Sequence, residues 1–369
     1  MVLAVLRSRW LRVCLTAFVL GALGAAAAPR AIPTRPGVPV AAAIATRKFD
    51  GVDYVNIADV AARLDLKLAW LERGHRVALR GSRTRAELEG DTRDITVNGM
   101  RVFLGDPVEE SKGELFVSRI DFERCLTPML RAGYGVTPLA APKVVVLDPG
   151  HGGKDQGTSV NEKTFALDVA LRAKKLLEAT GYRVVLTRQG DTYVALAQRA
   201  AIANARRGDL FVSIHFNALV NDKKTSGVEV YTFAPQHQRS APAWSPGAKD
   251  DTEDFASPGN QFDHWNVVLA HAIHQRFVND LKVFDRGKKL MHLGVLRPLR
   301  CPGMLVECGF LTSETEARKI ATPAYRQQLA ATIAAGIRDY GDTLQGLSGG
   351  PRAAAARVPR TKGRAGKTW

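Results

Sequence analysis

Hydrophobic residues in the second half of the chain form segments of two kinds, which follow each other in turn along the sequence. The stretch 144–147 is a continuous apolar run, which is typical of a strand buried on both faces. The stretch 162–180 instead repeats apolar residues at helical spacing. Further strands are expected at 183–187, 210–214, 228–232 and 304–307, and further helices at 194–207, 267–281 and 324–340. Strands that alternate with helices predict an α/β domain with a mostly parallel sheet and helices on both faces.

The preceding segment, 46–135, has a different pattern that predicts a small α+β domain. A strand at 54–57 leads into a helix, and Asn98-Gly99 lies between two apolar runs. Both residues accept the positive φ angles of a tight hairpin turn. The segment resembles the N-terminal-like domain of copper amine oxidases, a module appended to many exported bacterial proteins. Copper is not implied, because the one histidine, His75, is expected at the surface, and a structural or wall-docking role is expected.

The first 28 residues have the pattern of a secretory signal peptide. Arginines precede an apolar run at 13–23, which leads into the small residues 24–28. The run is shorter than the ~20 residues that a membrane-spanning helix needs, so cleavage after Ala27 or Ala28 is favoured over a membrane anchor. We therefore expect an exported protein of the periplasm or cell envelope.

The net charge of +16, from 52 Lys and Arg against 36 Asp and Glu, initially favours a polyanionic partner. Three of these positive charges lie in the signal peptide and six in the tail 348–369, and neither segment contains an acid. Export excludes nucleic acid as the natural partner, so the basic tail is expected to bind an anionic envelope surface. The expected organisation is a signal peptide (1–28), a linker (29–45), the small domain (46–135), a catalytic domain (142–345) and a disordered tail (348–369).

Cysteines predict no disulfide framework. Cys14 leaves with the signal peptide, and three thiols remain. Cys301 and Cys308 bracket an expected strand, which at about 3.3 Å per residue holds them beyond the ~6 Å that a disulfide tolerates. We expect buried, unpaired thiols.

Residues able to hold a metal follow the predicted strands. His151 lies in the glycine-rich stretch 148–153, His215 ends another strand, and Glu162 opens a helix. Open α/β sheets build their sites at the carboxyl ends of strands. Two imidazoles and one carboxylate suit Zn²⁺, with a fourth position left for water.

Glu307 ends a further strand, directly before Cys308. Side chains alternate along a strand, so these two residues point to opposite faces and only one can serve the site. The other histidines of this segment are expected to be structural or exposed. They are His237, His264, His271, His274 and His292.

The stretch 144–340 resembles the zinc-dependent N-acetylmuramoyl-L-alanine amidases of the type-3 class, which cleave peptidoglycan. Ten ordered blocks carry the resemblance, among them VVVLDPGHGGKDQG, NEKTFALDVA, DLFVSIHFNA and PGMLVECGF. The resemblance implies that His151, Glu162 and His215 bind zinc and that Glu307 is the catalytic glutamate. Asp155 also follows His151 but matches a separate position of the family pattern. Two further matching residues, Arg188 and Arg199, are expected first to pair with carboxylates of the fold and only second to contact substrate.

The activity implied is hydrolysis of the amide bond between N-acetylmuramic acid and L-alanine. Zinc would activate a water molecule, and Glu307 would pass the water's proton to the departing amine. Two alternatives are a zinc peptidase that acts on the stem peptide and a non-catalytic wall-binding protein. The irregular stretch 234–263 predicts either a surface insertion or a regulatory segment over the zinc, to which Glu253 or His237 would contribute. Nothing in the sequence identifies an activator protein.

Overall fold

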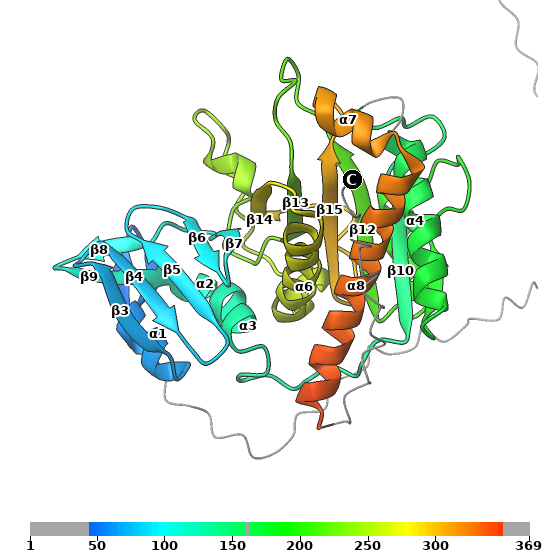
Figure 1. The fold of residues 1–369 in the computed structure, drawn as a ribbon. Coiled ribbons are helices and arrows are strands. Elements are labelled where there is room, and N and C mark those ends of the chain that lie inside the picture. Colours follow the sequence, from blue (N-terminus) through cyan, green and yellow to red (C-terminus); the bar gives the residue numbers. More distant parts are fainter. Residues whose placement is uncertain (1–43, 159–161, 350–369) are drawn as a thin grey trace, which may run out of the picture. The chain divides into compact units, whose positions relative to one another are not determined.

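The computed structural model describes residues 44–158 and 162–349 (Figure 1). The predicted signal peptide, most of the predicted linker and nearly all of the predicted basic tail lie outside these residues. Within the described part of the chain, no helix is both long and apolar enough to cross a membrane.

The sheet of the second half confirms the predicted α/β architecture. Its strands run in the order β11-β10-β12-β15-β13-β14, and every neighbouring pair is parallel except β13 and β15. The strands are β10 (Val144–Pro149), β11 (Arg183–Leu186), β12 (Leu210–Asn217), β13 (Val228–Phe233), β14 (Asp285–Met291) and β15 (Gly303–Phe310). The sequence pattern did not predict β14, because charged residues interrupt its apolar positions.

Helices cover both faces of this sheet (Figure 1). Three long helices pack on one face around the main core, namely α4 (Glu162–Glu178), α6 (Asp263–Leu281) and α8 (Pro323–Leu347). The other face packs against α5 (Leu196–Ala205) and apolar side chains of the stretch 293–301. The helix α7 (Glu314–Ile320) was not predicted, because its seven residues are too short to show a clear helical period.

Alternation along the strands decides which side chains reach the core. On β12, Val212, Ile214 and Phe216 are buried in the main core, which leaves His215 on the other face. On β15, Cys308 belongs to the same core, so Glu307 points away from it. The predicted opposition of Glu307 and Cys308 is therefore confirmed, and Cys125, Cys301 and Cys308 are buried and unpaired as expected.

The first half of the described chain is a β-rich module with a second core, to which α6 contributes Val267. Its strands are β1 (Thr46–Phe49), β2 (Val52–Asn56), β3 (Lys67–Glu72), β4 (Arg76–Arg80), β5 (Arg85–Glu89), β6 (Asp94–Val97), β7 (Met100–Phe103), β8 (Glu109–Ser111) and β9 (Glu114–Ser118). Its helical segments are α1 (Ile57–Arg63), α2 (Arg119–Asp121), a π-helical turn (Phe122–Leu126) and α3 (Thr127–Leu130). The predicted hairpin is confirmed, with φ angles of 54° at Asn98 and 79° at Gly99.

One sheet connects the β-rich module to the α/β segment. Strand β7 pairs in parallel with β14, with Val102 opposite Lys288. The module's strands β3 to β7 thereby extend the α/β sheet at its β14 edge. The division into two domains at residues 135–142 stays a prediction, because β7 and β14 lie on opposite sides of it and pair with each other.

Close packing of α6 against α8 yields a stability prediction. A Cβ added at Gly336 on α8 would lie 2.6 Å from the Cα of Ile273 on α6. Because backbone cannot move aside cheaply, we expect Gly336→Ala to lower the free energy of unfolding by about 1–3 kcal/mol, measured by urea denaturation. Gly346 on the same helix has nothing within 4 Å of an added Cβ. Gly346→Ala should be neutral or stabilise by up to about 1 kcal/mol, and equal stability of the two variants would contradict the packing argument.

Candidate metal centre

A tight glycine-rich turn places His151 at the carboxyl end of β10. His151 itself has a φ of 57°, and Gly152 and Gly153 also have positive φ values. A non-glycine residue in the left-handed region is uncommon and is often found at functional sites. A Cβ on Gly150 would lie 2.4 Å from the Cε1 atom of His215. Glycine at this position therefore allows the two histidine-bearing strand ends to approach each other.

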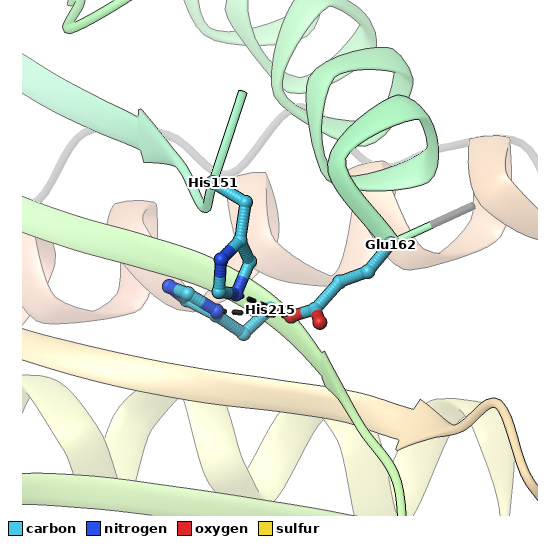
Figure 2. Close-up of side chains that lie close together, drawn as sticks. All are labelled: His151, Glu162 and His215. Atoms are coloured by element: carbon cyan, nitrogen blue, oxygen red, sulfur yellow. Dashed lines mark hydrogen bonds and ion pairs between the residues drawn. The ribbon is translucent and has the colours of Figure 1, made fainter. Parts of the chain in front are cut away.

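The structure brings the three predicted ligands, His151, Glu162 and His215, together (Figure 2). The Oε1 atom of Glu162 lies 3.1 Å from His151 Nε2 and 3.1 Å from His215 Nδ1. One ligand atom from each of the three residues lies within 4.8 Å of the others. Two imidazole nitrogens and one carboxylate oxygen form a donor set that catalytic zinc sites use, so these residues fit a zinc ion.

Asp155 fixes the orientation of the His151 imidazole by contacting its second ring nitrogen. Its Oδ1 atom lies 2.9 Å from His151 Nδ1, the nitrogen that faces away from Glu162. A carboxylate on the second ring nitrogen fixes the orientation of a metal-binding histidine. The sequence identified Asp155 only as a match to a separate position of the family pattern. No local pattern predicted this contact, because it depends on the left-handed backbone conformation of the turn.

Hydrogen bonds fix the carboxylate of Glu162 in the interior. Thr158 donates to Oε2 from its backbone nitrogen at 2.7 Å and from its hydroxyl at 2.8 Å. The backbone nitrogen of Phe216 donates to Oε1 at 3.2 Å. Burial alone would raise the pKa of Glu162, but hydrogen bonds with His151 and His215 outweigh it and lower the pKa well below its ordinary value. Glu162 is thus held as the anion that a cation needs.

Glu307 lies beside the triad, and one of its carboxyl oxygens has no hydrogen-bond partner in the part of the chain that the structure describes. It is the Cα partner of His215 across β12 and β15, and both side chains lie on the face away from the main core. Within the described residues, no hydrogen-bond partner reaches its buried Oε2 atom. Burial raises the pKa of Glu307 well above its ordinary value, and the charges of Glu162 and Glu229 add to this effect. The carboxyl group is therefore free to handle a proton.

Cys308 is unsuited to act as a nucleophile. Its side chain is packed in the main core, on the face opposite Glu307. Burial raises the pKa of the Cys308 thiol well above its ordinary value. A thiol that stays protonated is a poor nucleophile.

A buried ion pair supports the turn that carries His151. Arg199 Nη1 donates to Asp148 Oδ1 at 2.8 Å, and both side chains are almost completely buried. Arg199 also donates to the backbone carbonyls of Pro149 and His151. The expected carboxylate pairing is confirmed for Arg199. It is wrong for Arg188, whose guanidinium instead donates to backbone carbonyls, namely those of Pro149, Gly150, Lys163 and Gly190.

Charged residues of the long stretch 234–263 have partners other than the triad. Glu253 accepts hydrogen bonds from the guanidinium of Arg297. His237 donates its backbone N–H to the carbonyl of Glu253, and its ring lies 3.4 Å from Asp254. Glu253 thus pairs with a residue outside the stretch and His237 with residues inside it, and neither set of contacts supports the alternative of a segment bound over the metal.

Removing Arg199 should destabilise the whole domain. The Arg199→Met variant leaves the carboxylate of Asp148 buried without its cation, which costs about 3–5 kcal/mol of unfolding free energy. Arg206→Met is the matched control, since Arg206 is exposed just after the same helix and should change stability by less than about 0.5 kcal/mol. Chemical denaturation measures both. A loss below 1 kcal/mol for Arg199→Met would show that the turn does not depend on this pair.

Comparisons with known proteins find relatives of the α/β segment. A family model described as N-acetylmuramoyl-L-alanine amidase matches residues 145–339. An uncharacterized cell wall amidase of Bacillus anthracis is 32% identical over 210 residues, which cover 54% of this chain and 35% of that protein. N-acetylmuramoyl-L-alanine amidase AmiC of Neisseria meningitidis is 31% identical over 223 residues, which cover 54% of this chain and 53% of that protein. The chain thus spans between a third and about half of the length of these relatives.

A further relative matches over most of its length. N-acetylmuramoyl-L-alanine amidase AmiA of Escherichia coli is 30% identical over 220 residues, which cover 54% of this chain and 76% of that protein. The solved structure of N-acetylmuramoyl-L-alanine amidase AmiC2 of Nostoc punctiforme is 31% identical, covers 53% of this chain and 96% of that one, and has a TM-score of 0.44. Since the family model alone spans more than half of the sequence, this chain belongs to the N-acetylmuramoyl-L-alanine amidase family.

Proposed function

We propose that the chain is a peptidoglycan hydrolase that cleaves the amide bond between N-acetylmuramic acid and L-alanine. The observation that carries the proposal is the convergence of His151, Glu162 and His215 beside Glu307, whose buried Oε2 atom has no hydrogen-bond partner among the described residues. The names of the relatives support the substrate class. Zinc bound by the three residues would act as a Lewis acid and lower the pKa of a bound water.

The proposed proton path runs through Glu307. Its Oε2 atom, unpaired within the described residues, accepts a proton from the attacking water. The same carboxyl then gives that proton to the amide nitrogen as the carbon–nitrogen bond breaks. The products are the lactyl carboxylate of the muramic acid and the free amino group of the stem peptide. Asp155 keeps His151 in position throughout, through its contact with Nδ1.

The proposed setting is the cell envelope. A signal peptide at 1–28 would export the chain, and the basic stretch 348–369 would hold it near an anionic surface. Relatives named as cell wall amidases support this location. In the proposed organisation, the linker 29–45 precedes an accessory domain at 46–135 and an amidase domain at 142–345.

Glu307→Gln should abolish hydrolysis while zinc stays bound, because the amide is similar in size but cannot accept the proton. We expect turnover on purified peptidoglycan to fall at least about 10²-fold. Free stem peptides are measured by mass spectrometry and zinc by elemental analysis. Glu314→Gln, at an exposed glutamate on α7, is the control and should keep full activity.

Two outcomes would decide against this assignment. Substantial turnover by the Glu307→Gln variant would remove the proposed role of the carboxylate. Stem peptides shortened from within, without release from the muramic acid, would instead identify a peptidase. A wild-type protein that binds zinc and peptidoglycan but releases no product would be a wall-binding protein.

Zinc binding should depend on the triad. Losing an outer partner of a zinc ligand already weakens binding by about 10–100-fold, so we expect His215→Ala to weaken it at least that much. His75→Ala, in the β-rich module, should retain one zinc per chain. Chelation should abolish activity and lower the melting temperature, and added zinc should restore both. Full activity in the chelated protein would contradict zinc dependence.

A further inference from the structure

We propose that the sheet surface next to Glu307 binds the stem peptide of the substrate, and that Arg286 and Lys289 hold a carboxylate of that peptide. We call this the β13–β14–β7 surface and define it by the side chains of Tyr231, Arg286, Lys289, Arg101 and Phe103. The inference rests on the proposed function, since it assigns which part of peptidoglycan lies on which side of the candidate metal centre.

The strand register shows that the face carrying the candidate metal centre extends across the sheet. Glu307 on β15 is the Cα partner of Glu229 on β13, so their side chains lie on the same face. Tyr231, two residues on from Glu229, shares this face and is the Cα partner of Lys289 on β14. The face that carries His215 and Glu307 thus extends over β13 to β14.

Two cations share one carboxylate on this surface. Arg286 Nε and Lys289 Nζ each lie 2.8 Å from Glu229 Oε1, and the Tyr231 hydroxyl donates to Glu229 Oε2 at 2.6 Å. The Glu229 side chain is only 4% exposed, whereas those of Arg286 and Lys289 are 28% and 19% exposed. One buried anion therefore holds two cations at the surface, and a positive charge remains for a ligand.

The surface continues onto the β-rich module. Lys289 Nζ lies 5.7 Å from the ring centre of Phe103 on β7 and 5.9 Å from that of Tyr231. The guanidinium of Arg101 lies 4.7 Å from the Phe103 ring and pairs with Asp94. Phe103 and Arg101 are partly exposed. The module therefore adds the aromatic ring of Phe103 to the surface of the neighbouring segment, while the charge of Arg101 is balanced by Asp94.

The positive charge of the β13–β14–β7 surface indicates which part of peptidoglycan binds there. The sugars of peptidoglycan carry no charge once the lactyl group is in amide linkage, whereas the stem peptide carries free carboxylates. Arg286 and Lys289 share one carboxylate, that of Glu229, so a positive charge remains there and attracts such carboxylates. The peptide, and not the glycan, is therefore expected over β13 and β14.

The distance from β15 to β14 indicates which residue of the stem peptide meets Arg286 and Lys289. Neighbouring strands are about 4.8 Å apart, so β14 lies roughly 10 Å from β15. An extended peptide advances by about 3.5 Å per residue. About three extended residues beyond the scissile bond would reach β14 itself. Arg286 and Lys289 reach back from β14 to Glu229 on β13, one strand nearer, so their charged groups lie within reach of the second residue, a D-glutamate linked through its γ-carboxyl. Its free α-carboxylate is the group that we assign to Arg286 and Lys289.

The test compares two muramoyl tripeptides that differ only at this group, one with the free α-carboxylate and one with the α-carboxamide. Charged hydrogen bonds are the stronger ones, so Lys289→Gln should raise KM for the acid about tenfold or more. KM for the amide should change less than about twofold, and kcat should change little for either substrate. Lys289→Arg, which keeps the charge, should restore KM for the acid.

Further variants serve as controls. Lys175→Gln, at an exposed lysine on α4, should leave both KM values unchanged. Phe103→Ala should raise KM about threefold or more for both substrates, because the ring supplies contact and no charge. Equal KM changes for acid and amide in Lys289→Gln would overturn the carboxylate assignment. An unchanged KM in Phe103→Ala would remove the module from the surface.

A binding measurement separates this inference from the proposed function. The free stem tripeptide is titrated into the Glu307→Gln protein by calorimetry, where no turnover is needed. Adding Lys289→Gln should weaken this binding about tenfold or more, and equal affinity would overturn the inference. If the wild type released no stem peptide from either substrate, the proposed function would fail while the binding result still decided the role of Lys289.

Discussion

The candidate metal centre depends on how closely two strand ends approach each other. Gly150 leaves room for the ring of His215, and the left-handed conformation of His151 turns its imidazole toward the same point. The buried pair of Asp148 and Arg199 lies directly beneath, with Arg199 also bonded to the carbonyl of His151. Because backbone and ion pair act together, the positions of the two imidazoles are set by the fold before any metal binds.

Three carboxylates near this point have different surroundings and hence different chemistry. Glu162 is paired with two imidazoles and stays ionised. Glu229 is paired with Arg286 and Lys289 and serves as their anchor. Within the described residues, Glu307 has no partner for its Oε2 atom, and burial raises its pKa. The same functional group can therefore act as ligand, anchor or proton carrier, depending on which charges lie beside it.

The two faces of the sheet have separate tasks. The main core lies between one face and the helices α4, α6 and α8, and it buries Cys308. The other face carries His215, Glu307 and Glu229. It extends onto the β-rich module, because β14 pairs with β7. Stability and chemistry are thus divided by the alternation of side chains along each strand, and the module extends the face on which the chemistry would take place.

Local sequence pattern determined the strands and helices with continuous or periodic apolar residues, the hairpin at Asn98-Gly99, and the position of His151 after a strand. These features depend on neighbours in the chain, which a sequence displays directly. The pattern placed His215 and Glu307 on the correct strands but wrongly at their ends, because β12 continues to Asn217 and β15 to Phe310. Pattern did not reveal β14, whose residues are mostly charged, or α7, which is short. The contact of Asp155 with His151, the carbonyl partners of Arg188, and the pairing of β7 with β14 were decided by the tertiary structure alone. Each depends on how the backbone folds in space or on strands distant in sequence, because a polar side chain or an unpaired strand edge takes whichever partner folding brings within reach.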